Sequence, residues 1–243
     1  MSASMMKSRA IVRLVASESG EDVRGFLQGL VTNDVSGELP VYAALLSAQG
    51  KAMFDFFVWE GADGAILLDC EAQAADDLAK RLSLYRLRRK IEISRDEAIA
   101  VRWSQEPFDG ASPDPRLPEL GFRALSENKD AEPADDAYLA HRLSLGVPEG
   151  QAELGDILWL ETNAVELNGV SFEKGCYIGQ ENTARMNWRQ KVNRRLVVVP
   201  LENSDEKRLK VAYPDLGCAI DHLRVSDLDP STLPDWQAAG ITA

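Results

Sequence analysis

The sequence predicts an α+β fold whose sheets are mainly antiparallel. Helix-like and strand-like segments are mixed along the 243 residues, and two strand-like runs are joined by the short turn Gln49-Gly50-Lys51, which is typical of a β-hairpin. Neither a G-x-G-x-x-G pattern nor a P-loop opens a helix anywhere in the sequence. A doubly wound parallel sheet that binds a nucleotide is therefore disfavoured.

The first hundred residues carry most of the expected strands. These are short runs rich in apolar, β-branched or aromatic side chains and bounded by turn residues. Two helices are expected among them, because apolar residues recur at helical spacing over residues 20–30 and 74–82. The expected strands are 8–16, 40–47, 52–60, 64–70 and 88–94.

The next segment, residues 103–136, differs in composition. It contains five prolines and ends in an acidic pair, so we expect an irregular excursion anchored by a few apolar side chains. Beyond it the patterns predict helices at 134–145 and 179–187, a strand at 195–201 and at least one more strand near 210–221.

Two domains are expected, an α+β region over residues 1–190 and a short β domain over 191–243, with a frayed end of fifteen residues. A hydrophobic content of 45% is ample for packed cores. Three cysteines without paired spacing argue against a disulfide framework and favour a reducing compartment, so a cytoplasmic location is expected. The N-terminus lacks the apolar core of a secretory signal, and no apolar run approaches the roughly 18 residues of a membrane span.

The net charge of −12 disfavours stable binding to nucleic acid, because phosphate neutralisation needs a basic surface. Two basic segments, residues 80–90 and 185–195, stand out against this background. They are typical of solvated faces that balance an acidic protein, and they also suit an anion-receiving rim. The sequence leaves both interpretations open.

Histidine is scarce, with only His141 and His222 in the chain. A metal site within one chain needs three or four ligands at short spacings, and the sequence has neither C-x-x-C nor H-x-x-x-H. We therefore expect no resident metal. Any cysteine chemistry is expected to proceed without a histidine base.

The most distinctive segment is Lys174-Gly-Cys-Tyr-Ile-Gly-Gln-Glu181, which places Cys176 beside a lysine and just before an expected helix. A neighbouring ammonium group and the exposed N–H groups of a helix start both favour a thiolate. Cys70 and Cys218 are expected to be ordinary buried or half-buried thiols. A cysteine chosen only for its small size is the alternative at position 176.

Several segments together resemble the folate-binding YgfZ family, which is related to the glycine-cleavage T-protein and to iron-sulfur cluster assembly factors. The resemblance covers about residues 8–200, and its most specific part is the segment 174–181 followed by Arg185. The supporting segments are Leu27–Asp34, Gln49–Asp55, Tyr85–Arg88, Asp114–Pro118 and Glu161–Val170.

This resemblance implies a cloverleaf of subdomains around a central channel that holds tetrahydrofolate, or a one-carbon derivative of it, with a small C-terminal β-barrel. Only 48 residues follow Arg195, so the barrel is expected to be shortened here. The resemblance also implies which residues form the site. Cys176, Lys174 and Asp34 are expected to carry the chemistry, and Asn33, Asp34, Glu161, Gln180 and Arg185 are expected to contact the folate.

Each assignment has a plainer alternative. Asp34 suits a turn, Glu161 a solvated surface, and Arg185 and Lys174 a structural ion pair. For a pterin, however, an ionised carboxylate is a suitable acceptor, because it can take two adjacent N–H groups in charge-assisted bonds.

Three functions are compatible with these features. The resemblance favours a tetrahydrofolate-binding factor that assembles or repairs iron-sulfur clusters through Cys176, and so supports cluster-dependent tRNA modification indirectly. Its partners would be iron-sulfur enzymes or cluster-assembly proteins. The alternatives are a folate-dependent aminomethyl or methyl transferase or demethylase, in which Asp34 orients the substrate, and a module that only binds folate. The T-protein performs its transfer without this cysteine, which is why the first function is preferred.

Overall fold

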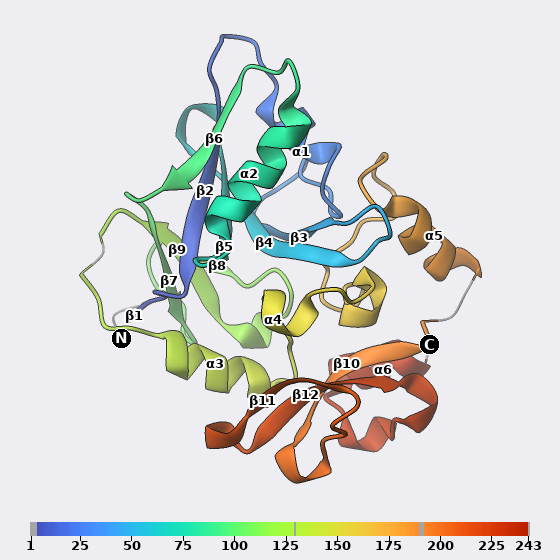
Figure 1. Ribbon diagram of the computed structural model, residues 1–243. Coiled ribbons are helices and arrows are strands. Elements are labelled where there is room, and N and C mark those ends of the chain that lie inside the picture. Colours follow the sequence, from blue (N-terminus) through green and yellow to red (C-terminus); the bar gives the residue numbers. More distant parts are fainter. Residues whose placement is uncertain (1–3, 129, 190–191, 243) are drawn as a thin grey trace.

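A computed structural model describes residues 4–128, 130–189 and 192–242. Its largest element is a five-stranded antiparallel sheet with the order β3-β4-β5-β2-β6 (Figure 1). Strands β3 and β4 form the expected hairpin, with Val41 opposite Val58. The strands are β2 (Arg9–Ala16), β3 (Val41–Leu46), β4 (Ala52–Glu60), β5 (Ile66–Glu71) and β6 (Ile91–Asp96).

Both faces of this sheet are buried. Helices α1 (Val23–Gln28) and α2 (Ala75–Arg86) cover one face, where Phe26 and Leu82 pack into one cluster with strand residues such as Phe56. The other face packs against the rest of the molecule in a second cluster that includes Trp103, Tyr138 and Trp159. The strands and helices predicted in the first hundred residues are confirmed. Their apolar residues recur with the period of a strand or a helix because each element buries a side against one of these two clusters.

A second sheet has the order β1-β7-β9-β8 and lies beside the first (Figure 1). Part of it falls in residues 103–136, so the expected irregular excursion is wrong for that part. The two-residue strands β1 and β8 show no readable alternation, and β1 pairs with β7 almost 100 residues away. The strands are β1 (Ser4–Met5), β7 (Ala100–Ser104), β8 (Ser112–Pro113) and β9 (Phe122–Ser126).

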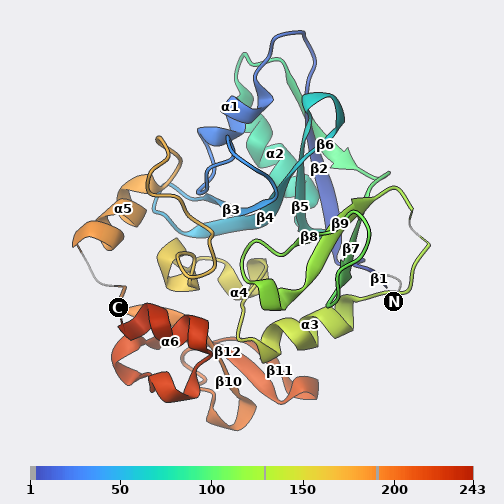
Figure 2. The same cartoon turned by 180° about the vertical axis from the view of Figure 1, so that it is seen from behind.

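Helices connect this sheet to the C-terminal part (Figure 2). The helices predicted at 134–145 and 179–187 are present as α3 and α5. The helical elements are α3 (Asp135–Ser144), α4 (Gln151–Leu154), the 3-10 helix η3 (Trp159–Thr162) and α5 (Gln180–Arg189).

The C-terminal part contains β10 (Arg194–Pro200), β11 (Leu209–Tyr213) and β12 (Cys218–Arg224). Over residues 192–242 these strands form a three-stranded antiparallel sheet with the order β10-β12-β11, where the resemblance implied a shortened barrel. The region near 210–221, where at least one strand was predicted, contains two strands, because Gly217 adopts a left-handed turn between them. The predicted boundary between residues 190 and 191 lies outside the described part of the chain.

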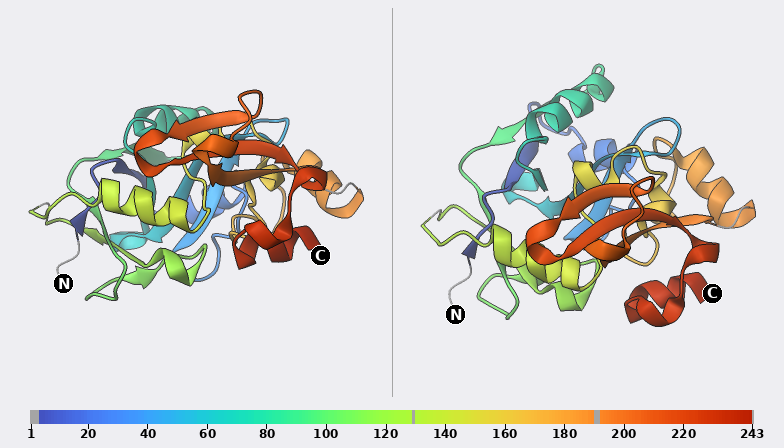
Figure 3. Two further views of the ribbon diagram at one scale, coloured as in Figure 1. Left: turned by 90° about the horizontal axis from the view of Figure 1, so that it is seen from below. Right: turned by 60° about the horizontal axis from the view of Figure 1, so that its bottom comes forward.

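Residues 230–242 contain a 3-10 helix and α6, so the expected frayed end is wrong for these residues. Helix α6 (Asp235–Thr242) lies against the C-terminal sheet (Figure 3), and Trp236 donates a hydrogen bond to the carbonyl of Leu145, at the end of α3, at 2.9 Å. Gln237 is 1% exposed and donates a hydrogen bond to the carbonyl of Leu196 at 2.8 Å. The two prolines before the helix obscured this docking, because proline alone is a signal for a turn.

Candidate functional site

Lys174 joins the cysteine motif to the turn that follows α1. Its side chain is buried, and its ammonium group donates hydrogen bonds to the backbone carbonyls of Gln28 at 2.7 Å, Val31, and Asn33 at 3.0 Å. These carbonyls are free to accept because they lie at the end of a short helix and in the turn after it. Two segments about 140 residues apart are thereby held together.

These three hydrogen bonds change the expected role of Lys174. The ammonium group is directed at residues 28–33, and no hydrogen bond joins it to Cys176 in the described part of the chain. Burial lowers the pKa of Lys174 to about 8, although the nearby carboxylate of Asp34 acts in the opposite direction. The lysine therefore acts first as a clamp on the turn.

The other end of the motif packs against the β3–β4 turn. Gly179 has a φ of +82°, and a Cβ placed there would lie 2.6 Å from the carbonyl oxygen of Ser47. Asn182 then donates to the carbonyl of Gln49 at 2.6 Å, at the start of α5. Only glycine allows both this backbone angle and this close approach.

Cys176 itself is exposed, in contrast to buried Cys70 and half-buried Cys218. A Cβ placed on the adjacent Gly175 would meet no atom within 4 Å. Because Cys176 is exposed, packing does not demand a small side chain at this position. The segment is anchored on both sides, by Lys174 and by Gly179, and presents one accessible thiol.

Asp34 lies in the turn that Lys174 clamps. Its Oδ1 atom accepts hydrogen bonds from the backbone and the side chain of Ser36, at 2.8 and 2.6 Å, and from Gln28 at 3.0 Å. The bonds from Ser36 lower the pKa of Asp34, so the group is a carboxylate at neutral pH. Its Oδ2 atom has no hydrogen bond within the described residues.

Asn33 holds the same turn in place. Its amide donates to the carbonyls of Tyr42 and Asn168, at 2.8 and 2.7 Å, and its Oδ1 accepts from the backbone N–H of Asp34. All three contacts are internal. Asn33 therefore positions Asp34, and its amide donors have no capacity left for a ligand.

Glu161, on η3, is paired with a histidine to which the sequence assigned no role. Its Oε2 atom lies 2.9 Å from Nε2 of His222, on β12. The contact links the middle of the chain to the C-terminal sheet, and it could not be predicted because the partners are 61 positions apart. The Oε1 atom of Glu161 has no hydrogen bond among the described residues.

Gln180 and Arg185 both belong to α5. Gln180 is half-buried at its first turn, and Arg185 is exposed further along. Neither Arg185 nor Lys174 forms an ion pair with Glu181 in the part of the chain that the structure describes, so the structural ion pair considered for them is not formed.

A second cluster, which the sequence did not reveal, is a network of buried charges between the first two sheets. Arg116 and Arg123 are fully buried, and Asp114 bridges them with oxygen to nitrogen distances of 2.8 and 3.1 Å. Glu149 pairs with Arg116 at 2.6 Å and with Arg9 at 3.2 Å. The three guanidinium groups surround one aromatic ring, that of Phe57.

The charges in this network stabilise one another. Burial alone would raise the pKa of Glu149, but the guanidinium groups of Arg116 and Arg9 outweigh burial and hold it well below its ordinary value. Asp55 lies at the margin, where burial and the charge of Glu149 raise its pKa to about 6. Because buried charges are costly unless paired, this network ties β2, β9, the segment after β8 and the segment after α3 into one unit.

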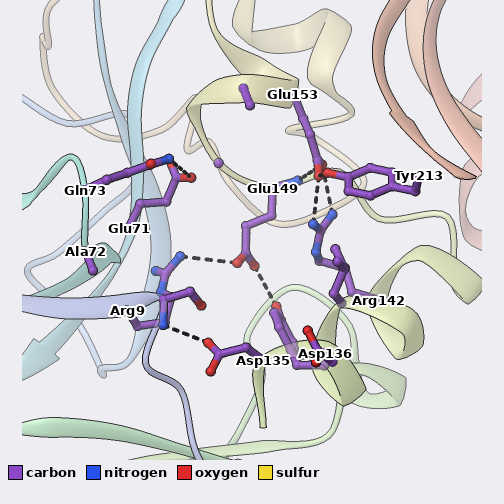
Figure 4. Close-up of a pocket in the computed structure, with 15 residues that line it drawn as sticks. Arg9, Glu71, Ala72, Gln73, Asp135, Asp136, Arg142, Glu149, Glu153 and Tyr213 are labelled. Carbon is purple, nitrogen blue, oxygen red and sulfur yellow. Dashed lines mark hydrogen bonds and ion pairs between the residues drawn. The ribbon is translucent and has the colours of Figure 1, made fainter. Parts of the chain in front are cut away.

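A cavity of about 370 Å³ opens beside this network (Figure 4). Arg9, Glu149, Arg142, Glu153 and Tyr213 line it, and their charged groups pair with one another rather than pointing at open space. It contains none of the residues predicted from the sequence. We therefore do not assign the predicted site to this cavity.

In chemical terms the predicted site offers an exposed thiol and two carboxylates. No group of three histidine, cysteine, aspartate or glutamate side chains within the described ranges is arranged to hold a metal ion. The thiol has no histidine hydrogen-bonded to it, since His141 contacts Gln105 and Glu119 and His222 contacts Glu161. Cys176 is therefore suited to act as a nucleophile or as one ligand, without a paired base.

Comparison with known proteins gives a consistent relationship, although no protein-family model matches the chain. The mitochondrial iron-sulfur cluster assembly factor IBA57 of Mus musculus is 33% identical over 241 residues, covering 81% of this chain and 65% of the relative. The Homo sapiens protein of that name is 33% identical, covering 74% and 62%. The Neurospora crassa homologue of IBA57 is 31% identical, covering 76% and 51%. The chain thus spans between about half and two thirds of these relatives' length.

The names of these relatives contradict the cytoplasmic location expected from the composition, because all of them are described as mitochondrial. A low cysteine count indicates a reducing environment and does not distinguish one reducing compartment from another. No helix in the described ranges is long and apolar enough to span a membrane.

Among solved structures, glycine cleavage system aminomethyltransferase T from Bartonella henselae superposes with a TM-score of 0.63. The match covers 91% of this chain and 78% of that structure at 12% identity, so it establishes the fold alone. The predicted α+β, T-protein-like architecture is confirmed. The chain is therefore similar in sequence to the iron-sulfur cluster assembly factors named IBA57, and it has the fold of aminomethyltransferase T.

Proposed function

We propose that this protein acts in iron-sulfur cluster assembly or repair, with Cys176 as the group that contacts the cluster. One observation carries the proposal: Cys176 is the exposed cysteine of the chain, on a segment anchored by Lys174 and Gly179. The homologous assembly factors support the same process. A thiolate is the ligand that iron-sulfur clusters use most.

A single thiol supplies one ligand. Since Cys70 is buried and Cys218 half-buried, the remaining ligands must come from a partner, an iron-sulfur enzyme or another assembly protein. In this proposal the cluster is cargo that the protein helps to deliver. Support for cluster-dependent tRNA modification would then be an indirect consequence, because enzymes that need clusters would receive them.

The test is rescue of a cell that lacks the protein, measured as the activity of a cluster-dependent enzyme. Cys176→Ser should abolish rescue while the folded protein accumulates normally, because serine is a poor ligand for iron. Cys218→Ser is the matched control and should rescue. Full rescue by Cys176→Ser would remove the proposal.

We further propose that tetrahydrofolate, or a one-carbon derivative, binds near Asp34 and Glu161. The chain's own residues are compatible with such a ligand: each carboxylate keeps one oxygen without a hydrogen-bond partner among the described residues, while the other oxygen is fixed by Ser36 or by His222. Free, oriented carboxylate oxygens suit the N–H groups of a pterin. The fold shared with aminomethyltransferase T supports the same ligand.

Calorimetric titration with tetrahydrofolate tests this second proposal. Asp34→Ala should weaken binding roughly tenfold, the effect of losing one or two charge-assisted hydrogen bonds. Glu38→Ala, which removes an exposed carboxylate nearby in sequence, is the control. Unchanged affinity in Asp34→Ala would remove Asp34 from the site. Methyl or aminomethyl transfer by the purified protein would instead support the transferase alternative.

A further inference from the structure

Helices α1 and α2 lie on the same side of the first sheet (Figures 1 and 2). A groove lies between α1 and the end of α2. Its volume is about 890 Å³. Gly25, Phe26 and Gly29 form one wall, and the other is the turn after α2, from Tyr85 to Arg89. Phe26 lines the groove with only a small part of its side chain, since the residue is 6% exposed.

The turn after α2 exposes Leu87 in a strained backbone conformation. Leu87 is 86% exposed, the largest exposure among the bulky apolar residues of the described chain, and Leu84 nearby is 62% exposed. Leu87 has a φ of +51° and a ψ of −109°, a region that favours glycine. Such conformations cost roughly 1–3 kcal/mol and are found mainly where function requires them.

The surroundings of the groove are basic, in contrast to the chain as a whole. Residues 80–90 contain six basic residues and no acidic one, in a protein with a net charge of −12. Arg89 pairs with Glu21, and Lys90 with Glu18 at 3.3 Å. The other four, which form no ion pair within the described residues, are Lys80, Arg81, Arg86 and Arg88.

We infer that this groove is a docking site for an acidic segment of a partner protein that carries a bulky apolar side chain. The apolar side chain would pack against Phe26 and Leu87, and the acidic residues would meet Arg86 and Arg88. Burial of a large apolar side chain among arginines is the usual composition of an interface centre. The inference uses neither Cys176 nor the folate residues and stands apart from the proposed function.

Other anionic partners fit the surface less well. Nucleic acid would have to approach a protein of net charge −12, and the lining of the groove is mainly apolar, which does not suit a phosphate backbone. An anionic membrane is flat and would meet the exposed leucines without filling the groove between the helices. A concave site of this size accommodates a side chain and the short segment that bears it.

The test uses a fluorescein-labelled peptide in which aspartate and glutamate flank a central phenylalanine, titrated with the full chain by fluorescence anisotropy. Saturable binding is expected, and it should weaken as salt is raised because exposed charges are screened. A peptide with serine in place of phenylalanine should bind at least roughly tenfold more weakly.

Two substitutions locate the binding. Leu87→Gly should weaken binding roughly tenfold while leaving thermal stability unchanged or raised, because glycine adopts this backbone conformation without strain. Arg88→Glu should also weaken binding. The matched controls lie on the C-terminal part: Leu216→Gly, at an exposed leucine, and Lys207→Glu should bind as the unaltered chain does.

Several results would overturn the inference. These are the absence of saturable peptide binding, equal binding by Leu87→Gly, and equal loss in the control variants. Tighter binding of phosphatidylserine vesicles or of a single-stranded oligonucleotide than of the peptide, abolished by the same substitutions, would assign the groove to a membrane or to nucleic acid instead.

Discussion

At the scale of single residues, Lys174 belongs to the predicted cysteine motif but has a different role from the one expected. Its position beside Cys176 suggested an ammonium group that favours the thiolate. The structure directs the side chain away to three carbonyls of the turn after α1. Sequence adjacency says nothing about the direction of a long side chain, so this could not be predicted.

The burial of Lys174 has a measurable consequence for stability. Its pKa is lowered from 10.5 in an unfolded chain to about 8, so folding releases a proton when the pH lies between these two values. The unfolded state binds more protons there, and the free energy of unfolding should rise with pH by roughly 1 kcal/mol per unit between pH 8 and 10.

Urea denaturation of the unaltered chain and of Lys174→Met measures this effect. The difference between their free energies of unfolding should change over pH 8–10 and stay constant below pH 7, where the lysine is protonated in both states. Parallel curves over the whole range would show that Lys174 is not buried as described.

The sequence did not predict the roles of several polar residues, because no local pattern distinguishes them from surface residues. Arg116 and Arg123 are typical surface residues by composition, yet both are fully buried in a network with Asp114 and Glu149. His222 was not assigned, because its partner Glu161 is distant in sequence. Pairing of this kind depends on tertiary contacts, which a local pattern does not contain.

At the scale of elements, the joint between the β3–β4 turn and α5 determines how the cysteine motif is presented. Gly50 and Gly179 both have positive φ angles and lie against each other, where a Cβ on Gly179 would be 3.0 Å from Cα of Gly50. The motif therefore reaches the surface from a rigid base formed by the first sheet.

Replacing Gly179 with alanine should disturb this joint. The added methyl group would meet the carbonyl of Ser47 and occupy a strained backbone angle, so we expect a loss of roughly 1–3 kcal/mol in the free energy of unfolding. Gly175→Ala is the matched control, since its Cβ meets nothing within 4 Å, and it should change stability little. Equal effects of both substitutions in denaturant unfolding would contradict the described contact.

Elements with strong local patterns were predicted well, and those that depend on distant pairing were not. The β3–β4 hairpin and helices α2 and α3 follow from periodicity and turn residues alone. Strand β1 pairs with β7, which is distant in the sequence. Helix α6 docks on the distant strand β10 through the hydrogen bond from Gln237 to Leu196. Two-residue strands and a helix preceded by prolines carry no local signal of those contacts.

At the scale of the whole molecule, the three sheets are joined by two kinds of contact. The buried charges around Phe57 connect the first and second sheets. The pair Glu161–His222, with Asn163 donating to the carbonyl of Leu196 at 2.9 Å, connects the C-terminal sheet to the middle of the chain. The fold was predictable from its resemblance to a known family, whereas these joints were visible only in three dimensions.

This arrangement leaves the thiol of Cys176 accessible and its neighbouring turns fixed, which is the basis of our proposal that the protein acts in cluster assembly through Cys176. The most direct test is the activity of a cluster-dependent enzyme in cells that lack the protein and receive one of its variants. We predict that Cys176→Ser fails to restore this activity and that Cys218→Ser restores it fully. Restoration by both variants, at equal protein levels, would contradict the central claim.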